Sequence, residues 1–155
     1  EKEFTSSIFN FTGDHFGRKF INSKPNLYEK SSVAYIMYGK SIPKSLNLTP
    51  GSHIDIMPTL IEMIAPKGFE YYSFGESMFT KGKNEGIAFD KMIEGNDLYY
   101  FPKGSNIEKI DLNTYKERNL KKSDLELKHN KLMALAWYYT MKGNDLKTTK
   151  KTVKR

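Results

Sequence analysis

The sequence predicts an α/β fold. Two short apolar runs, Ser6 to Phe11 and Ser32 to Tyr38, are typical of strands, and a segment with helical spacing follows them in residues 53–68. The second half of the chain has three more strand-like runs and then a long amphipathic segment. The order strand, loop, strand, helix indicates an α/β arrangement, followed by a small antiparallel sheet packed by a C-terminal helix.

The two strands predicted in the first part are bounded by turn residues. The run that ends at Phe11 stops at Thr12-Gly13, and the second run stops at Gly39 before a loop that contains proline. The segment between them, Lys19 to Ser31, is polar and is predicted to be a loop.

A helix is predicted after the second strand. Asp55 is suited to cap it, Pro58 is tolerated within its first turn, and Pro66 with Gly68 ends it. Four apolar residues recur at helical spacing: Ile56, Leu60, Met63 and Ile64.

The next segment predicts an antiparallel meander. Its strand-like runs are residues 86–93, 97–101 and 107–112, separated by the turn signals Gly95-Asn96 and Gly104-Ser105.

The last predicted element is a helix from Asp124 to Lys142. Ser123 and Glu126 form a capping box, and Gly143 supplies a stop. We therefore expect residues 81–143 to form the meander and a terminal helix that packs on it. One face of the helix carries Leu125, Leu132, Ala136 and Tyr139.

Charge gives little support to a nucleic-acid function. The formal charge is +7, but the last nine residues hold five cations and no acid. The other 146 residues carry 20 basic and 18 acidic side chains, a net charge of +2. We interpret residues 144–155 as a basic, solvated and disordered tail, and we expect no nucleic-acid partner. Cysteine is absent, which excludes disulfides, thiolate nucleophiles and cysteine-zinc sites.

An Asp-His pair, Asp14 and His15, follows the first predicted strand at once. Ligands bind at the carboxyl ends of strands in open α/β sheets, where a carboxylate and an imidazole are suited to a metal ion. Two adjacent ligands do not make a site, because structural zinc takes four protein ligands and catalytic zinc three. Spacing alone favours a capped turn and leaves metal ligation open.

Three other residues are candidates for a functional role. Arg18 could bind a phosphate or sulfate oxygen bidentately, although a lone arginine in a loop is usually solvated. His53 and Asp55 lie two residues apart before the predicted helix. We interpret them as structural, with Asp55 as a cap and a carboxylate favoured by the helix dipole.

Four segments taken in order resemble one family: FTGDHFGR, SSVAYIMYGK, SHIDIMPTLIEMIAP and GFEYYSFGESMF. They are similar to the C-terminal portion of the sulfatase-like catalytic domain of the alkaline phosphatase superfamily, closest to its lipoteichoic acid synthase and phosphoglycerol transferase branch. The resemblance covers roughly Ser6 to Phe79, and beyond it only the layout agrees. It implies that residues 1–80 form the C-terminal part of a catalytic domain, a partial alkaline-phosphatase-like sheet with helices. Residues 81–143 would be the small antiparallel sheet and terminal helix of the same domain.

The resemblance implies roles for four residues. Asp14 and His15 match the family's metal ligands, which hold Mn²⁺ or Mg²⁺ in this branch and Zn²⁺ in some relatives. His53 and Asp55 match a recurrent motif of chiefly structural role, in which the aspartate caps the helix behind the active-site sheet. No residue of FGESMF is assigned a catalytic role.

The family's threonine nucleophile and acidic metal ligand lie well upstream of Gly-Asp-His, whereas Glu1 is thirteen residues before Asp14. We therefore expect a C-terminal fragment of a longer enzyme, without catalytic residues of its own and inactive alone. The implied reaction is attack of the threonine on a phosphodiester of a phosphoglycerol lipid or polymer. The metal ion would activate the nucleophile, and the N-terminal remainder of the domain would be the fragment's partner.

The resemblance also implies a location at the extracellular face of the membrane, reached through upstream segments. The fragment itself is expected to be soluble, because no apolar run approaches the roughly 20 residues that cross a bilayer. Two alternatives stay open. The Asp-His motif does not encode the ester cleaved, so the chain could belong to a sulfatase or another phosphatase-like hydrolase. It could also be a non-catalytic module that binds anionic polymer or a membrane surface.

Overall fold

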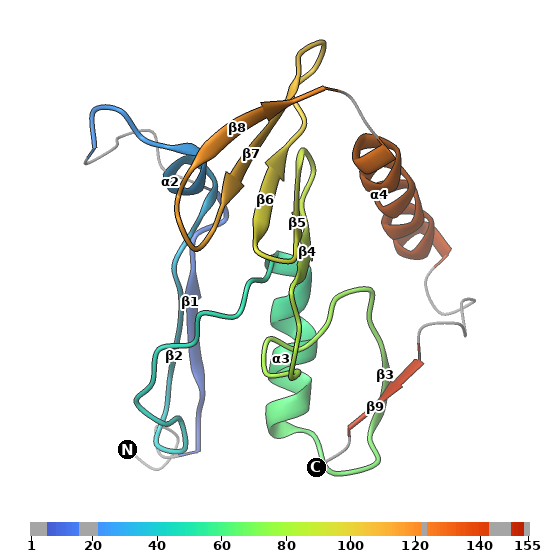
Figure 1. Cartoon of the computed structure of the whole chain (residues 1–155). Helices are drawn as coiled ribbons and strands as arrows, with labels where there is room; N and C mark the ends of the chain where they lie inside the picture. Colours follow the sequence, from blue (N-terminus) through green and yellow to red (C-terminus); the bar gives the residue numbers. More distant parts are fainter. Residues whose placement is uncertain (1–5, 16–21, 122–123, 143–149, 154–155) are drawn as a thin grey trace. The chain divides into compact units, whose positions relative to one another are not determined.

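The computed structural model describes residues 6–15, 22–121, 124–142 and 150–153 (Figure 1). This described part contains three α-helices and several small antiparallel sheets, which confirms a mixed α/β fold. Contacts divide the chain into two compact units, Glu1–Leu48 and Thr49–Arg155, and each is described by itself. The division falls inside the segment 1–80 that the sequence analysis treated as one part.

The first unit contains a two-stranded antiparallel sheet, in which β1 (Phe9–Thr12) pairs with β2 (Tyr35–Tyr38). Both strands lie within or next to the predicted runs and are shorter than predicted. Phe9 is opposite Tyr38 in the register, so their rings lie 6.5 Å apart on one face. The pairing is antiparallel, whereas the α/β prediction had suggested an open sheet with ligands at the carboxyl ends of its strands.

A short helix, α2 (Leu27–Ser31), forms inside the segment that was predicted to be a loop. A capping box explains it: Asn26 Oδ1 accepts from Glu29 N at 2.9 Å, and Glu29 Oε2 accepts from Asn26 N at 2.8 Å. The buried side chain of Leu27 anchors the helix. A strong local cap and one apolar anchor thus override the polar composition of this segment.

The second unit begins with the predicted helix. A 3₁₀ turn, η1 (His53–Asp55), leads directly into α3 (Ile56–Ile64), with Pro58 buried near its start. Helix α3 ends before Pro66, as predicted, and β3 (Glu70–Tyr72) follows it.

The predicted meander is confirmed as a five-stranded antiparallel sheet whose strands pair in chain order. Gly95 and Gly104 lie in turns with φ of 64° and 76°, which glycine adopts without strain. The strands are β4 (Glu85–Ile87), β5 (Lys91–Glu94), β6 (Asp97–Tyr100), β7 (Ile107–Asp111) and β8 (Glu117–Leu120).

Two details of the meander differ from the prediction. Residues 86–93 form a hairpin instead of one strand, because Ala88 N donates to Lys91 O at 2.9 Å across a two-residue turn that has no glycine, proline or asparagine. Strand β8 was not predicted, since its sequence ERNL lacks alternating apolar residues and its side chains are largely exposed.

Helix α4 (Asp124–Lys142) has the predicted bounds and packs on the meander. Leu125 and Leu132 contact a core formed by Met92, Tyr99 and Ile107. The two residues predicted to cap and stop this helix, Ser123 and Gly143, lie outside the described residues. Among the described residues, no helix combines the length and apolar character needed to cross a bilayer.

A buried histidine fixes the position of α4. His129 is 3% exposed, its ring stacks on Phe101 at 4.5 Å, and Nε2 lies 2.9 Å from Ala88 O. A carbonyl oxygen can only accept, so Nε2 carries the hydrogen.

The prediction of a disordered tail is wrong for residues 150–153. Strand β9 (Lys150–Thr152) pairs antiparallel with β3, and Val153, which is 1% exposed, exchanges backbone hydrogen bonds with Gly68 and Phe69 at 3.0 Å. The β-branched Thr152 and Val153 supply the strand propensity and the buried contact that a count of charges does not weigh. Residues 144–149 and 154–155 of the predicted tail lie outside the described residues.

Candidate functional site

The Asp-His pair lies just after β1, in the first unit. Asp14 Oδ1 accepts from His15 N at 2.9 Å, and Asp14 Oδ2 lies 3.5 Å from His15 Nε2. The two side chains are 87% and 74% exposed. Both side chains therefore project into solvent with a carboxylate oxygen and a ring nitrogen side by side.

This geometry fits two ligands of one metal ion. Ligand atoms that each lie about 2.1 Å from a tetrahedral ion are about 3.4 Å apart, close to the separation of Asp14 Oδ2 and His15 Nε2. The described residues contain no group of three His, Cys, Asp or Glu side chains that could hold an ion. Within the described residues the pair therefore supplies at most half of a metal site. A solvated polar turn would show the same contacts.

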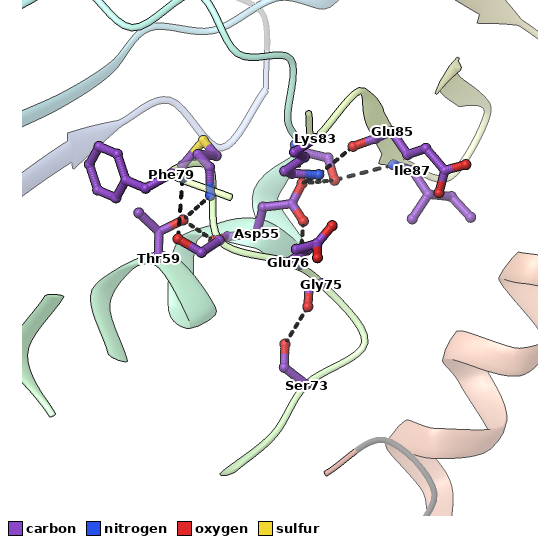
Figure 2. Close-up of polar contacts among 12 residues, drawn as sticks. Asp55, Thr59, Ser73, Gly75, Glu76, Phe79, Lys83, Glu85 and Ile87 are labelled. Carbon is purple, nitrogen blue, oxygen red and sulfur yellow. Dashed lines mark hydrogen bonds and ion pairs between the residues drawn. The ribbon is translucent and has the colours of Figure 1, made fainter. Parts of the chain in front are cut away.

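A second polar centre lies in the second unit, around the carboxylate of Asp55 (Figure 2). Asp55 is 2% exposed, and Oδ2 accepts from Ser52 N at 2.7 Å and from Ser52 Oγ at 3.2 Å. Asp55 Oδ1 accepts from Glu76 N at 2.8 Å. The carboxylate thus closes the 3₁₀ turn η1. It makes no capping hydrogen bond to α3, the helix that it was predicted to cap.

The charge of Asp55 is balanced by a buried lysine. Lys83 Nζ lies 3.3 Å from Asp55 Oδ2 and also donates to the carbonyl oxygen of Glu85 (Figure 2). The Lys83 side chain is only 3% exposed, so the pair is removed from water and held by hydrogen bonds from both sides. Lys83 was not predicted as a site residue, because a lysine in a glycine-containing turn is normally solvated.

The FGES loop docks on this centre. A Cβ atom added at Gly75 would lie 2.0 Å from Ile54 O, so only glycine fits there. Thr59 Oγ1 accepts from Met78 N at 2.9 Å while it donates to Asp55 O at 2.6 Å. Two segments about twenty residues apart in the sequence are therefore locked together by a threonine, an aspartate and a glycine contact.

The serine of this loop has a local structural role. Ser77 is 5% exposed, and its hydroxyl accepts from Phe79 N at 3.2 Å. These contacts provide no base that could activate it as a nucleophile.

A cavity of about 300 Å³ lies beside the Asp55 centre. Three of its lining residues are lysines, and each has a partner: Lys83 with Asp55, Lys128 with Glu94, and Lys151 with the carbonyl oxygen of Gly75. The cavity therefore presents cations that are already neutralised or hydrogen-bonded.

The other predicted site residues belong to different units or lie outside the described residues. His53 is exposed at the start of η1, in the second unit, whereas Asp14 and His15 belong to the first unit. Arg18, predicted to bind substrate, lies outside the described residues.

Comparisons with protein family models, with curated proteins and with solved structures find no match for this chain.

Proposed function

We propose that this chain is the C-terminal part of a metal-dependent enzyme of the sulfatase-like type, closest in its motifs to the phosphoglycerol transferases. The observation that carries the proposal is the docking of two of those motifs. Asp55 of SHIDIMPTL accepts from the backbone of Glu76 of FGESMF, and Gly75 packs against Ile54 O. Two of the four motifs that carry the resemblance thus form one structural unit.

Within this proposal, Asp14 and His15 contribute two ligands to a divalent ion, Mn²⁺ or Mg²⁺ first and Zn²⁺ second. The ion, when bound, would lower the pKa of a hydroxyl nucleophile and neutralise charge on phosphoryl oxygens. The adjacent Oδ2 and Nε2 atoms would hold it from one side. Arg18, three residues on, would bind a phosphoryl oxygen.

The remaining parts of the site would come from upstream. The threonine nucleophile and the acidic third ligand would belong to the N-terminal part of the domain, which would be the partner of this chain. The whole enzyme would act at the extracellular membrane surface on a phosphoglycerol lipid or polymer. The partial alkaline-phosphatase-like sheet that this requires would form when further strands extend the β1–β2 sheet.

The test is to express this chain together with the coding sequence upstream of it and to supply Mn²⁺. We expect Mn²⁺-dependent release of diacylglycerol from a lipid with a phosphoglycerol headgroup, and no such release from the segment alone. Turnover of an aryl sulfate instead, with a Cys/Ser-x-Pro-x-Arg segment upstream, would support a sulfatase. An upstream sequence with neither nucleophile would contradict the enzymatic proposal.

A further inference from the structure

Helix α4 has two apolar faces, of which the sheet covers one. Leu125, His129 and Leu132 face the meander. The opposite side of the helix is exposed and carries a row of apolar residues, with Asn130 beside them. Four of its apolar residues recur at intervals of seven, four and three: Leu127, Ala134, Tyr138 and Met141. Trp137 lies next to them, one turn before Met141. We call these five residues the outer face of α4.

The large apolar residues of the outer face are strongly exposed to solvent. Trp137 is 68% exposed, Met141 66%, Leu127 52% and Tyr138 48%. Isolated exposed apolar residues are common. A row of large ones along one helix face instead marks a surface that binds a protein partner, a ligand or a membrane.

Beyond the first turn of α4, which carries Asp124 and Glu126, the charged residues along the helix are all lysines. The sequence has no acidic residue between Glu126 and Asp145, and it has three lysines there. Lys131 and Lys142 are exposed and lie four residues after Leu127 and Tyr138, so they border the outer face. Residues 1–126 carry 17 basic and 17 acidic side chains, so the formal charge of +7 arises entirely from residues 127–155.

We propose that the outer face of α4 docks on an anionic lipid surface, with the helix lying along the membrane interface. Tryptophan and tyrosine favour the interface between headgroups and acyl chains, and methionine and leucine favour the acyl chains. Lysines that border such a face extend their ammonium groups to anionic headgroups. Docking by the outer face leaves the contacts of α4 with the meander intact.

The composition favours lipid over other partners. A nucleic-acid surface needs several cations to neutralise successive phosphates, and within the described part of the chain two lysines border the outer face. Lysine is depleted from protein interfaces, whereas Lys131 and Lys142 border the outer face. The inference does not rest on the metal site proposed above, and vesicle binding needs no metal ion.

Trp137 is the only tryptophan of the chain and reports the binding directly. The experiment mixes the 155-residue protein with phosphatidylcholine vesicles that contain, or lack, roughly one third phosphatidylglycerol. We expect the emission of Trp137 to shift to shorter wavelength and to be quenched by lipids brominated in their acyl chains. Partitioning should be about tenfold stronger with phosphatidylglycerol.

A matched pair of variants distinguishes docking by the outer face from nonspecific hydrophobic binding to vesicles. Met141→Glu lies on the outer face, and Met57→Glu replaces a methionine of α3 with similar exposure, 66% against 63%. We expect Met141→Glu to lower the partition coefficient about tenfold and Met57→Glu to leave it unchanged, with equal circular dichroism for both.

Three results would overturn the proposal. The first is an unshifted Trp137 emission with anionic vesicles. The second is equal binding to neutral and anionic vesicles. The third is a dimer in light scattering that Met141→Glu dissociates while vesicles leave it intact, which would assign the outer face to a second copy of the chain.

Discussion

Lys83 Nζ and Asp55 Oδ2 lie 3.3 Å apart, and the two side chains are only 3% and 2% exposed. The pair joins the turn before β4 to the turn before α3, and Asp55 also holds the backbone of Glu76. One buried charge pair therefore connects three segments of the second unit.

Replacing Lys83 with methionine should destabilise the protein strongly. The substitution keeps most of the side-chain volume but leaves the Asp55 carboxylate buried without its counter-charge, which costs about 3–5 kcal/mol. Urea denaturation followed by circular dichroism measures the loss. Lys150→Met is the control, because Lys150 and its partner Glu70 are both about half exposed. An exposed ion pair contributes little to stability, so the urea midpoint of this variant should not move. Equal midpoints for both variants would show that Lys83 is not the counter-charge.

Gly75→Ala should also destabilise the second unit. The added Cβ would meet Ile54 O at 2.0 Å, so the FGES loop would have to leave the Asp55 centre, at a cost of about 1–3 kcal/mol. Gly51→Ala is a suitable comparison, because the nearest atom to its Cβ is the flexible Met78 Sδ at 3.0 Å. Thermal unfolding of the two variants tests this, and a larger loss for Gly51→Ala would contradict the described packing.

Stability should fall at alkaline pH because of Tyr71. Burial, together with the hydrogen bond and charge of Glu62 and the charge of Glu76, raises the pKa of Tyr71 to about 12. The unfolded tyrosine ionises near pH 10, so between pH 10 and 12 the unfolded state loses protons that the folded state keeps. The resulting stabilisation is complete below pH 10 and declines above it.

Tyr71→Phe should remove this contribution. Between pH 9 and pH 11 the wild-type free energy of unfolding should fall by about 1 kcal/mol more than that of the variant. Urea denaturation at the two pH values makes the comparison, and parallel pH dependences would show that the Tyr71–Glu62 contact does not shift the pKa in solution.

The sequence predicted those elements whose signals are local. Helix α3 and the three meander runs were identifiable from apolar spacing and glycine turns, and α4 was predicted at its observed bounds. Strand β9 could not be predicted, because it forms only by pairing with β3, some eighty residues away in the chain. The 88–91 turn was missed for another reason: its central residues are Phe89 and Asp90, and a single aspartate inside an apolar run is a weak turn signal.

The candidate site was predictable only in part. Asp14 and His15 were identifiable because they follow a predicted strand, and Asp55 was identifiable because it precedes a predicted helix. The partner of Asp55, Lys83, could not be found from spacing, since an ion pair between residues 28 positions apart depends on how two turns pack. The same limit applies to Gly75, whose need for glycine comes from a contact with Ile54.

The metal content of the protein expressed with its upstream sequence shows whether Asp14 and His15 are metal ligands. Purified wild type, Asp14→Asn and Asp90→Asn are compared by mass spectrometry of bound Mn²⁺, with circular dichroism as the check on folding. Asp90 is a control carboxylate in the 88–91 turn, paired with Lys91 at 2.7 Å. The account predicts that Asp14→Asn alone loses the ion and the Mn²⁺-dependent turnover. Unchanged metal content and turnover in Asp14→Asn would contradict it.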